Sequence, residues 1–80
     1  MEHPKIKCTR NYLRSRGIKY QIKWPYDNLY VLVETDNGKK HYQQICFSLL
    51  NFNSEEAIIE FLEGEVSKLL SKGLIKTYSR

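Results

Sequence analysis

The chain has 80 residues, of which 41% are apolar and 28% charged, and its formal net charge is +4. This length allows one hydrophobic core, so we expect a single small globular domain over residues 1–80, and the composition argues against a disordered chain. No apolar run approaches the roughly 18 residues of a membrane span, and no apolar stretch near the start resembles a signal peptide, so we expect a cytoplasmic protein without membrane contact.

Positive charge is concentrated at the start of the chain. Residues 1–24 contain seven lysines and arginines and one glutamate, a net charge of +6, whereas residues 25–80 contain six cations and eight anions, a net charge of −2. A basic segment of this kind suits a phosphate backbone or an acidic protein. The alternative is a solvated face that balances the acidic residues of the carboxy-terminal part, and the sequence leaves both open.

The segment TRNYLRSRG predicts a short helix from about residue 9 to residue 16. Arg10 and Arg14 lie four residues apart and therefore share one side of this helix, opposite its apolar side. Gly17 is a natural residue to end it. Residues 4–8 alternate between polar and apolar side chains, and we expect an extended lead-in there.

From residue 18 the apolar residues recur with a period of two, which predicts two antiparallel strands joined by the loop PYDN, residues 25–28. A four-residue loop gives one apolar face, whose pairs are Trp24 with Leu29, Ile22 with Val31 and Tyr20 with Val33. Tyr20 and Trp24 are therefore expected in the core.

The other face of this hairpin is expected to be polar. Lys19 opposes Glu34 on it, and Lys23 opposes Tyr30. Only Lys23, Tyr30 and the loop residue Tyr26 are then free for a partner. That set is too small for a base-stacking surface and large enough for the edge of a binding patch.

The dipeptide Asn-Gly at residues 37–38 is the strongest short hairpin signal in the chain, and a third strand is expected over residues 39–47. Its register is open. A two-residue loop opposes Val33 to Tyr42, whereas a three-residue loop opposes Leu32 to Tyr42, and this slip of one residue exchanges the two faces of the strand.

The stretch NFNSEEAIIEFLEGEVSKLLSKG predicts a long helix, with Asn53 as N-cap, Glu56 completing a capping box, and Gly73 at its end. Its apolar stripe contains Ile58, Phe61, Leu62, Val66, Leu69 and Leu70. The glutamates on its outer ridge would repel nucleic acid, so the helix is expected to support the core. Residues 74–78 are expected to form a short strand or a docked tail. The predicted fold class is α+β, in the order α-β-β-β-α, with a three-stranded antiparallel sheet packed against a long C-terminal helix.

Two family resemblances follow from these elements. The stretch FNSEEA, residues 52–57, resembles the start of the helix in AP2-type and integrase arm-type DNA-binding domains, although the strands lack the arginine and tryptophan pattern of those families. The α-β-β-β-α order is similar to the double-stranded-RNA-binding fold, whose second helix begins with lysines that hold phosphates. The matching residues 54–56 are Ser-Glu-Glu here, which disfavours RNA. We assign the chain to neither family.

We expect no enzymatic activity and no cofactor, because the sequence shows no nucleophile with a paired base and no glycine-rich phosphate loop. His3 and Cys8 repeat the spacing of His41 and Cys46, and four such side chains could bind zinc. A gap of five along a strand sends two side chains to opposite faces, which favours two small buried cysteines and no metal site. A cytosolic setting argues against a disulfide between them.

Two functions are consistent with these patterns. The first is a small non-enzymatic nucleic-acid-binding module, with DNA as the expected ligand. Its predicted contact residues are Lys7, Arg10, Arg14, Arg16, Lys19 and Lys23. The second is a protein-binding accessory or inhibitor protein that uses the outer face of the sheet. A homodimer is compatible with either function. Its predicted contact residues are Tyr26, Tyr30 and Leu32.

Two further expectations accompany these hypotheses. One alanine against nine lysines and seven isoleucines favours an AT-rich genome, such as that of a phage or mobile element of a low-GC host. If the first helix covered the outer face of the sheet, that face would be core and would not serve as an interface.

Overall fold

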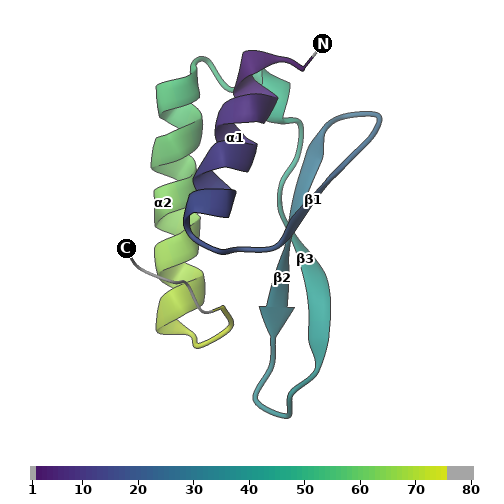
Figure 1. Ribbon diagram of the computed structural model, residues 1–80, viewed down its shortest axis with the longest axis vertical. Helices are drawn as coiled ribbons and strands as arrows, with labels where there is room; N and C mark the ends of the chain where they lie inside the picture. The colour runs from purple at the N-terminus through teal and green to yellow at the C-terminus, as the bar shows by residue number, and fades with distance from the viewer. Residues whose placement is uncertain (1, 76–80) are drawn as a thin grey trace.

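A computed structural model describes residues 2–75 of the chain. Its elements are helix α1 (Pro4–Ser15), strands β1 (Tyr20–Lys23), β2 (Asn28–Glu34) and β3 (Lys40–Cys46), a single 3₁₀ turn η1 (Leu49–Asn51), and helix α2 (Glu55–Ser71) (Figure 1). The three strands form one antiparallel sheet in the order β1-β2-β3. This confirms the predicted α-β-β-β-α order. No helix within the described range is long and apolar enough to cross a membrane.

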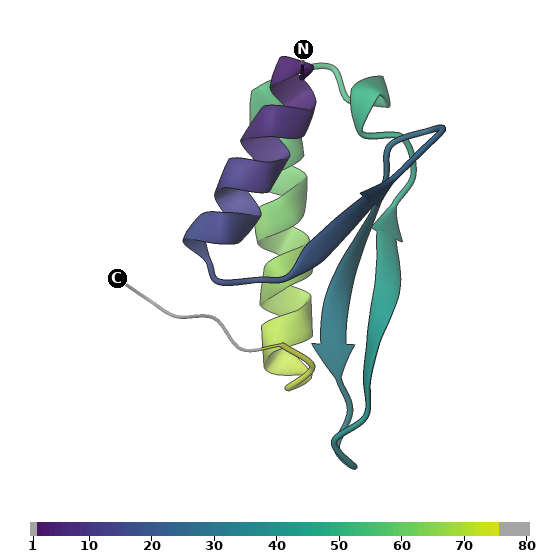
Figure 2. The same ribbon diagram turned by 45° about the vertical axis from the view of Figure 1, so that its right-hand side comes forward.

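The molecule has two layers. Helices α1 and α2 lie side by side on the same face of the sheet, as both ribbon views show (Figures 1 and 2). Side chains from both helices and from β2 meet in one core, whose fully or nearly fully buried members are Leu13, Ile18, Leu29, Val31, Val33, Leu49, Ile58, Leu62, Val66, Leu69 and Ile75. The opposite face of the sheet is covered by neither helix, so the alternative in which the first helix buries it is wrong.

Helix α1 begins five residues earlier than predicted, so the expected extended lead-in is wrong. The Nδ1 atom of His3 accepts a hydrogen bond from the Lys5 backbone N–H at 3.1 Å, and Pro4 occupies the first helical position. The apolar side of this first half includes Thr9, which is fully buried and donates its hydroxyl proton to the Lys5 carbonyl at 2.8 Å. Because this buried position holds a polar residue, the helical period of apolar residues cannot be recognised in this part of the sequence. The helix ends at Ser15 with Arg16 as its C-cap, one residue before the predicted end, and Gly17 follows with the left-handed φ of 70° that is typical of the residue after a C-cap.

The first hairpin keeps its predicted faces but pairs two residues out of the predicted register. Ile22 lies opposite Leu29 and Tyr20 lies opposite Val31. Because the shift is even, the same side chains still face the core. Strand β1 ends at Lys23, however, so the predicted pair of Trp24 with Leu29 is wrong and so is the prediction that Trp24 is buried.

The second hairpin has the register of the three-residue loop, in which Leu32 opposes Tyr42. The Thr35 N–H donates to the Lys39 carbonyl at 2.8 Å and closes the loop, and Gly38 takes a left-handed φ of 82° inside it. The sequence predicted the turn. The structure settles which face of β3 looks outward.

Helix α2 has 17 residues and begins one residue later than the predicted capping box requires. The Ser54 hydroxyl accepts from the Ala57 N–H at 3.1 Å, so Ser54 is the N-cap in place of Asn53. Beyond the helix, the Leu74 carbonyl accepts from the Glu34 N–H at 2.8 Å, which docks the chain beside β2. Residues 76–78 of the predicted strand or tail lie outside the described residues.

Candidate nucleic-acid interface

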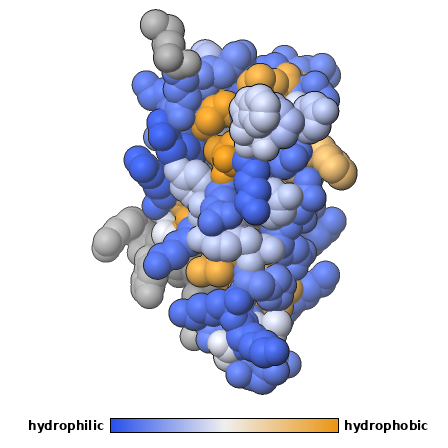
Figure 3. Space-filling view, turned by 90° about the vertical axis from the view of Figure 1, so that its right-hand side faces the viewer, coloured by the Kyte–Doolittle hydropathy of each residue, from blue (hydrophilic) through white to orange (hydrophobic). Residues whose placement is uncertain are grey.

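The outer face of the sheet is the face that points away from both helices. Side chains that alternate with the core-facing ones occupy it, namely Lys19, Gln21, Lys23, Asn28, Tyr30, Leu32, Glu34, Lys40, Tyr42 and Gln44. Lys19 precedes β1, and its carbonyl accepts from the Leu32 N–H at 2.9 Å, so its backbone continues the edge of the sheet. Figure 3 looks onto this side and shows pale side chains of intermediate hydropathy among hydrophilic ones.

The outer face carries a positive charge. Lys19, Lys23 and Lys40 contribute three cations, and Glu34 is its one carboxylate among the described residues. Glu34 opposes Lys40, so the predicted pairing of Glu34 with Lys19 is wrong. Within residues 2–75, none of the three lysines has a carboxylate oxygen within 4 Å of its ammonium group. None of the three lysines is therefore held in a close ion pair among the described residues, although Lys40 lies directly opposite Glu34.

Tyrosines and a leucine form the middle of this face. The Lys23 ammonium lies over the Tyr30 ring, 4.6 Å from its centroid, although the residue directly opposite Lys23 is Asn28. Leu32 is half-buried and lies opposite Tyr42, which is 37% exposed. Tyrosine rings beside lysines suit both the bases and the phosphates of a nucleic acid.

The aromatic tip, which we define as Trp24, Tyr26 and Phe47, lies at one end of the sheet. Trp24 is 88% exposed, Tyr26 67% and Phe47 77%. Trp24 and Tyr26 belong to the loop between β1 and β2, and the Asp27 carbonyl of that loop accepts from the Leu49 N–H at 3.2 Å. This hydrogen bond ties the loop to the segment after β3. Hydrophobic side chains gather at this end of the molecule in Figure 3.

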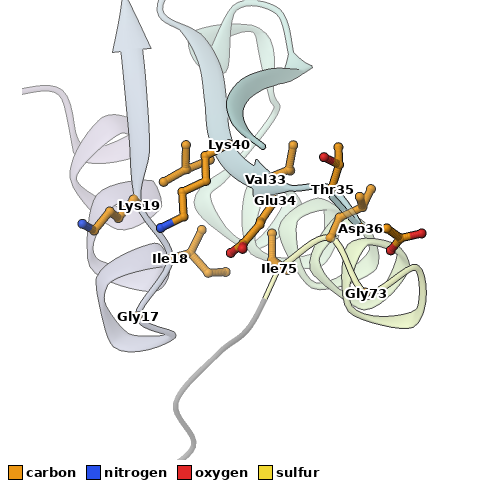
Figure 4. Close-up of a pocket in the computed structure, with 12 residues that line it drawn as sticks. Gly17, Ile18, Lys19, Val33, Glu34, Thr35, Asp36, Lys40, Gly73 and Ile75 are labelled. Carbon is orange, nitrogen blue, oxygen red and sulfur yellow. The ribbon is translucent and has the colours of Figure 1, made fainter. Parts of the chain in front are cut away.

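The other end of the outer face opens into a hollow of about 430 Å³ where β2 meets the end of α2 (Figure 4). Glu34 and Lys40 are opposite one another in the sheet and extend in the same general direction there, whereas Lys19 points away from the hollow. Asp36 adds a second carboxylate to the lining. With both signs of charge present, this end offers less to an anion than the part of the face around Lys19 and Lys23.

The predicted cationic set falls into two groups that lie in different layers. Lys19 and Lys23 are on the outer face, whereas Lys7, Arg10, Arg14 and Arg16 belong to α1 and its C-cap. Lys7 and Arg14 are exposed.

Two of the four helix-layer cations have partners within the protein. Arg10 pairs with Glu2 through its terminal nitrogen, and its Nε is buried without a partner. Arg16 lies 3.9 Å from a Glu63 carboxylate oxygen and 5.0 Å from the centroid of the Tyr12 ring. For part of α1, the structure therefore supports the alternative in which acidic residues balance the basic segment. Carboxylates of the same layer offset the charge of Arg10 and Arg16.

The cysteines are thiols with internal hydrogen bonds. Cys8 Sγ donates to the Lys5 carbonyl at 3.3 Å, and Cys46 Sγ donates to the Phe47 carbonyl at 2.8 Å. Burial raises the pKa of both thiols, which keeps them protonated and weakens them as nucleophiles or metal ligands. Residues 2–75 hold no group of three or more histidine, cysteine or acidic side chains placed to bind a metal.

Sequence reasoning missed three contributors to this surface. Whether Lys40 and Tyr42 lie on the outer face depends on the register of β3. Only the register of the three-residue loop places them there. Trp24 continues the alternation of apolar residues in the sequence, but strand β1 ends one residue before it and leaves its side chain exposed. Neither a protein-family model, nor a curated protein, nor a solved structure matches this chain, so its residues alone carry the interpretation.

Proposed function

We propose that the chain is a nucleic-acid-binding module whose contact surface is the outer face of the sheet. One observation carries the proposal. Neither helix covers this face, and it presents Lys19, Lys23 and Lys40 with two tyrosines and a single carboxylate, counted over residues 2–75. Lysines bind phosphate as point charges, and tyrosine rings offer flat surfaces to bases.

The arrangement of charge in the two layers supports this choice of surface. The exposed glutamates of α2 would repel a phosphate backbone, and they lie in the helical layer. They are Glu55, Glu56, Glu60 and Glu63. A ligand that approaches the outer face meets the lysines first and has the whole sheet between itself and those carboxylates.

The number of lysines sets the expected salt dependence. A face that neutralises about three phosphates releases the counterions of those phosphates, so the logarithm of the binding constant should fall with a slope of about −2 to −3 against the logarithm of salt concentration. Binding of this kind is weak and largely independent of sequence. We expect dissociation constants on the order of micromolar at low salt.

Fluorescence anisotropy tests the proposal. Labelled single-stranded DNA, duplex DNA and duplex RNA are titrated with the protein at low and at physiological salt. We expect binding to at least one of them that weakens with salt at the slope given above. Absence of binding to all three at low salt would overturn the proposed function.

A second candidate function is the binding of another protein, and a different observation favours it. An apolar hollow of about 340 Å³ lies beside Phe47 and is lined by Ile45, Phe52 and Phe61, with the Phe52 and Phe61 rings 5.3 Å apart. An exposed aromatic side chain at the rim of an apolar hollow is typical of a protein-binding hot spot.

This candidate is tested with a Phe47→Ser variant. It should keep the circular dichroism spectrum of the wild type, because Phe47 is largely exposed, and should lose a protein that the wild type retains in a pull-down. Retention of the same proteins by both would remove Phe47 from any protein interface.

A further inference from the structure

The loop between β1 and β2 exposes the largest aromatic side chain of the protein. Trp24 and Tyr26 project from four residues that connect Lys23 to Asn28, while Tyr20 and Ile22 on the preceding strand pack against the core. The loop is fixed at its end by the Asp27–Leu49 backbone hydrogen bond, and Asp27 has a left-handed φ of 55°. Because the Trp24 indole is exposed to solvent, it contributes little to the stability of the core.

We infer that single-stranded nucleic acid is the ligand of this surface and that its bases stack on Trp24 and Tyr26. The inference rests on the proposed function and adds the class of nucleic acid. Two features that are adjacent in the chain support it. The exposed rings offer flat faces to bases, and Lys23, the residue before Trp24, offers a cation to the phosphate of the same strand.

Single strands fit this arrangement better than duplexes do. In a duplex the flat faces of the bases are covered by their neighbours, and a side chain must first unstack a base step to reach them. The bases of a single strand can turn outward and stack on an aromatic ring without that step. Tyr42, also exposed on the outer face, extends the same kind of contact across the sheet.

The single tryptophan of the chain makes the test direct, because tryptophan emission reports on Trp24 alone. The full chain is titrated with oligothymidylate, oligouridylate and duplex DNA while emission and anisotropy are both recorded. We expect both single strands to quench the emission, with the same midpoint as the anisotropy change, and the duplex to bind more weakly. The two single-stranded arms also show whether the sugar matters.

A Trp24→Ala variant measures the contribution of stacking. One stacked base is worth about 1–3 kcal/mol, so the affinity for oligothymidylate should fall about 5- to 150-fold. Trp24→Phe should recover part of the loss, because it keeps an aromatic ring. Leu70→Ala is the matched control, since Leu70 is also a partly exposed apolar residue but lies on α2, and it should bind as the wild type does.

The outcomes separate this inference from the proposed function. If single strands bind without quenching and Trp24→Ala binds as well as the wild type, the stacking inference is wrong and the proposed function stands. Tighter binding to the duplex than to both single strands also overturns the inference. If no nucleic acid binds at low salt, both fail together.

Discussion

Replacement of Trp24 by alanine tests whether this side chain is exposed, as in the structure, or buried, as its sequence pattern predicts. The free energy of unfolding is enough to tell the two cases apart. A tryptophan side chain removes up to about 250 Å² from water when it is fully buried. Trp24 is 88% exposed, so about 30 Å² of it is covered, given that maximum. At about 25 cal/mol per Å² the loss of this contact costs less than about 1 kcal/mol.

A buried tryptophan would behave differently. Its replacement by alanine would cost about 3–5 kcal/mol, which is a large part of the roughly 4–12 kcal/mol expected for a domain of this size. The matched core variant is Leu29→Ala, because Leu29 is fully buried on β2, and it should lose about 2–5 kcal/mol.

Urea unfolding followed by far-ultraviolet circular dichroism measures both variants, since tryptophan emission is lost in one of them. We expect the midpoint of Trp24→Ala close to that of the wild type and the midpoint of Leu29→Ala far below it. A loss of more than about 3 kcal/mol in Trp24→Ala would show a packed indole. It would refute both the exposed loop and the stacking inference.

Three further predictions test local features of the fold. Gly38→Ala should lower the free energy of unfolding by about 1–2 kcal/mol, because residue 38 has a φ of 82° that disfavours a side chain, and urea midpoints measure it. Ser54→Ala should cost about 1 kcal/mol through the lost N-cap of α2, whereas Asn53→Ala should change the midpoint little; the reverse order would restore the predicted cap. Burial raises the pKa of the Cys8 and Cys46 thiols, so at neutral pH iodoacetamide should alkylate them more slowly in the folded chain than in urea, and their rates should rise only at higher pH; equal rates in both states would contradict the burial of these thiols.

Much of the fold followed from local signals in the sequence. Alternation placed Ile22 and Val31 toward the core, and this held despite a register error, because an error of two residues preserves the faces of a strand. Asn37 and Gly38 marked the second turn, and Gly73 marked the end of α2. Each of these signals acts within a few residues of the structure that it predicts.

The errors arose where neighbouring residues support two local structures equally well. Asn53 and Ser54 are both good N-caps, and the side-chain hydrogen bond that chooses Ser54 cannot be read from their order. The start of α1 depends on a cap from His3 and on Thr9 buried against the rest of the protein. Tertiary packing determines where such helices begin, and nearby residues in the sequence do not indicate it.

The candidate site was predictable only in part for the same reason. Alternation alone placed Lys19, Lys23 and Tyr30 on the outer face of the sheet. The addition of Lys40 and Tyr42 required the register of β3. That this face is free of both helices required the position of α1 in the helical layer, which depends on packing between residues far apart in the chain (Figure 2).

The most direct test of the proposed function compares two double charge reversals that change the net charge by the same amount. Lys19→Glu with Lys23→Glu alters the outer face, and Lys7→Glu with Arg14→Glu alters the exposed side of α1. Their dissociation constants for labelled oligothymidylate are measured by anisotropy at low salt. We expect the outer-face variant to lose at least about tenfold in affinity and the helix variant to lose much less, because direct phosphate contacts exceed the effect of net charge. Equal losses, or a larger loss in the helix variant, would contradict binding through the outer face.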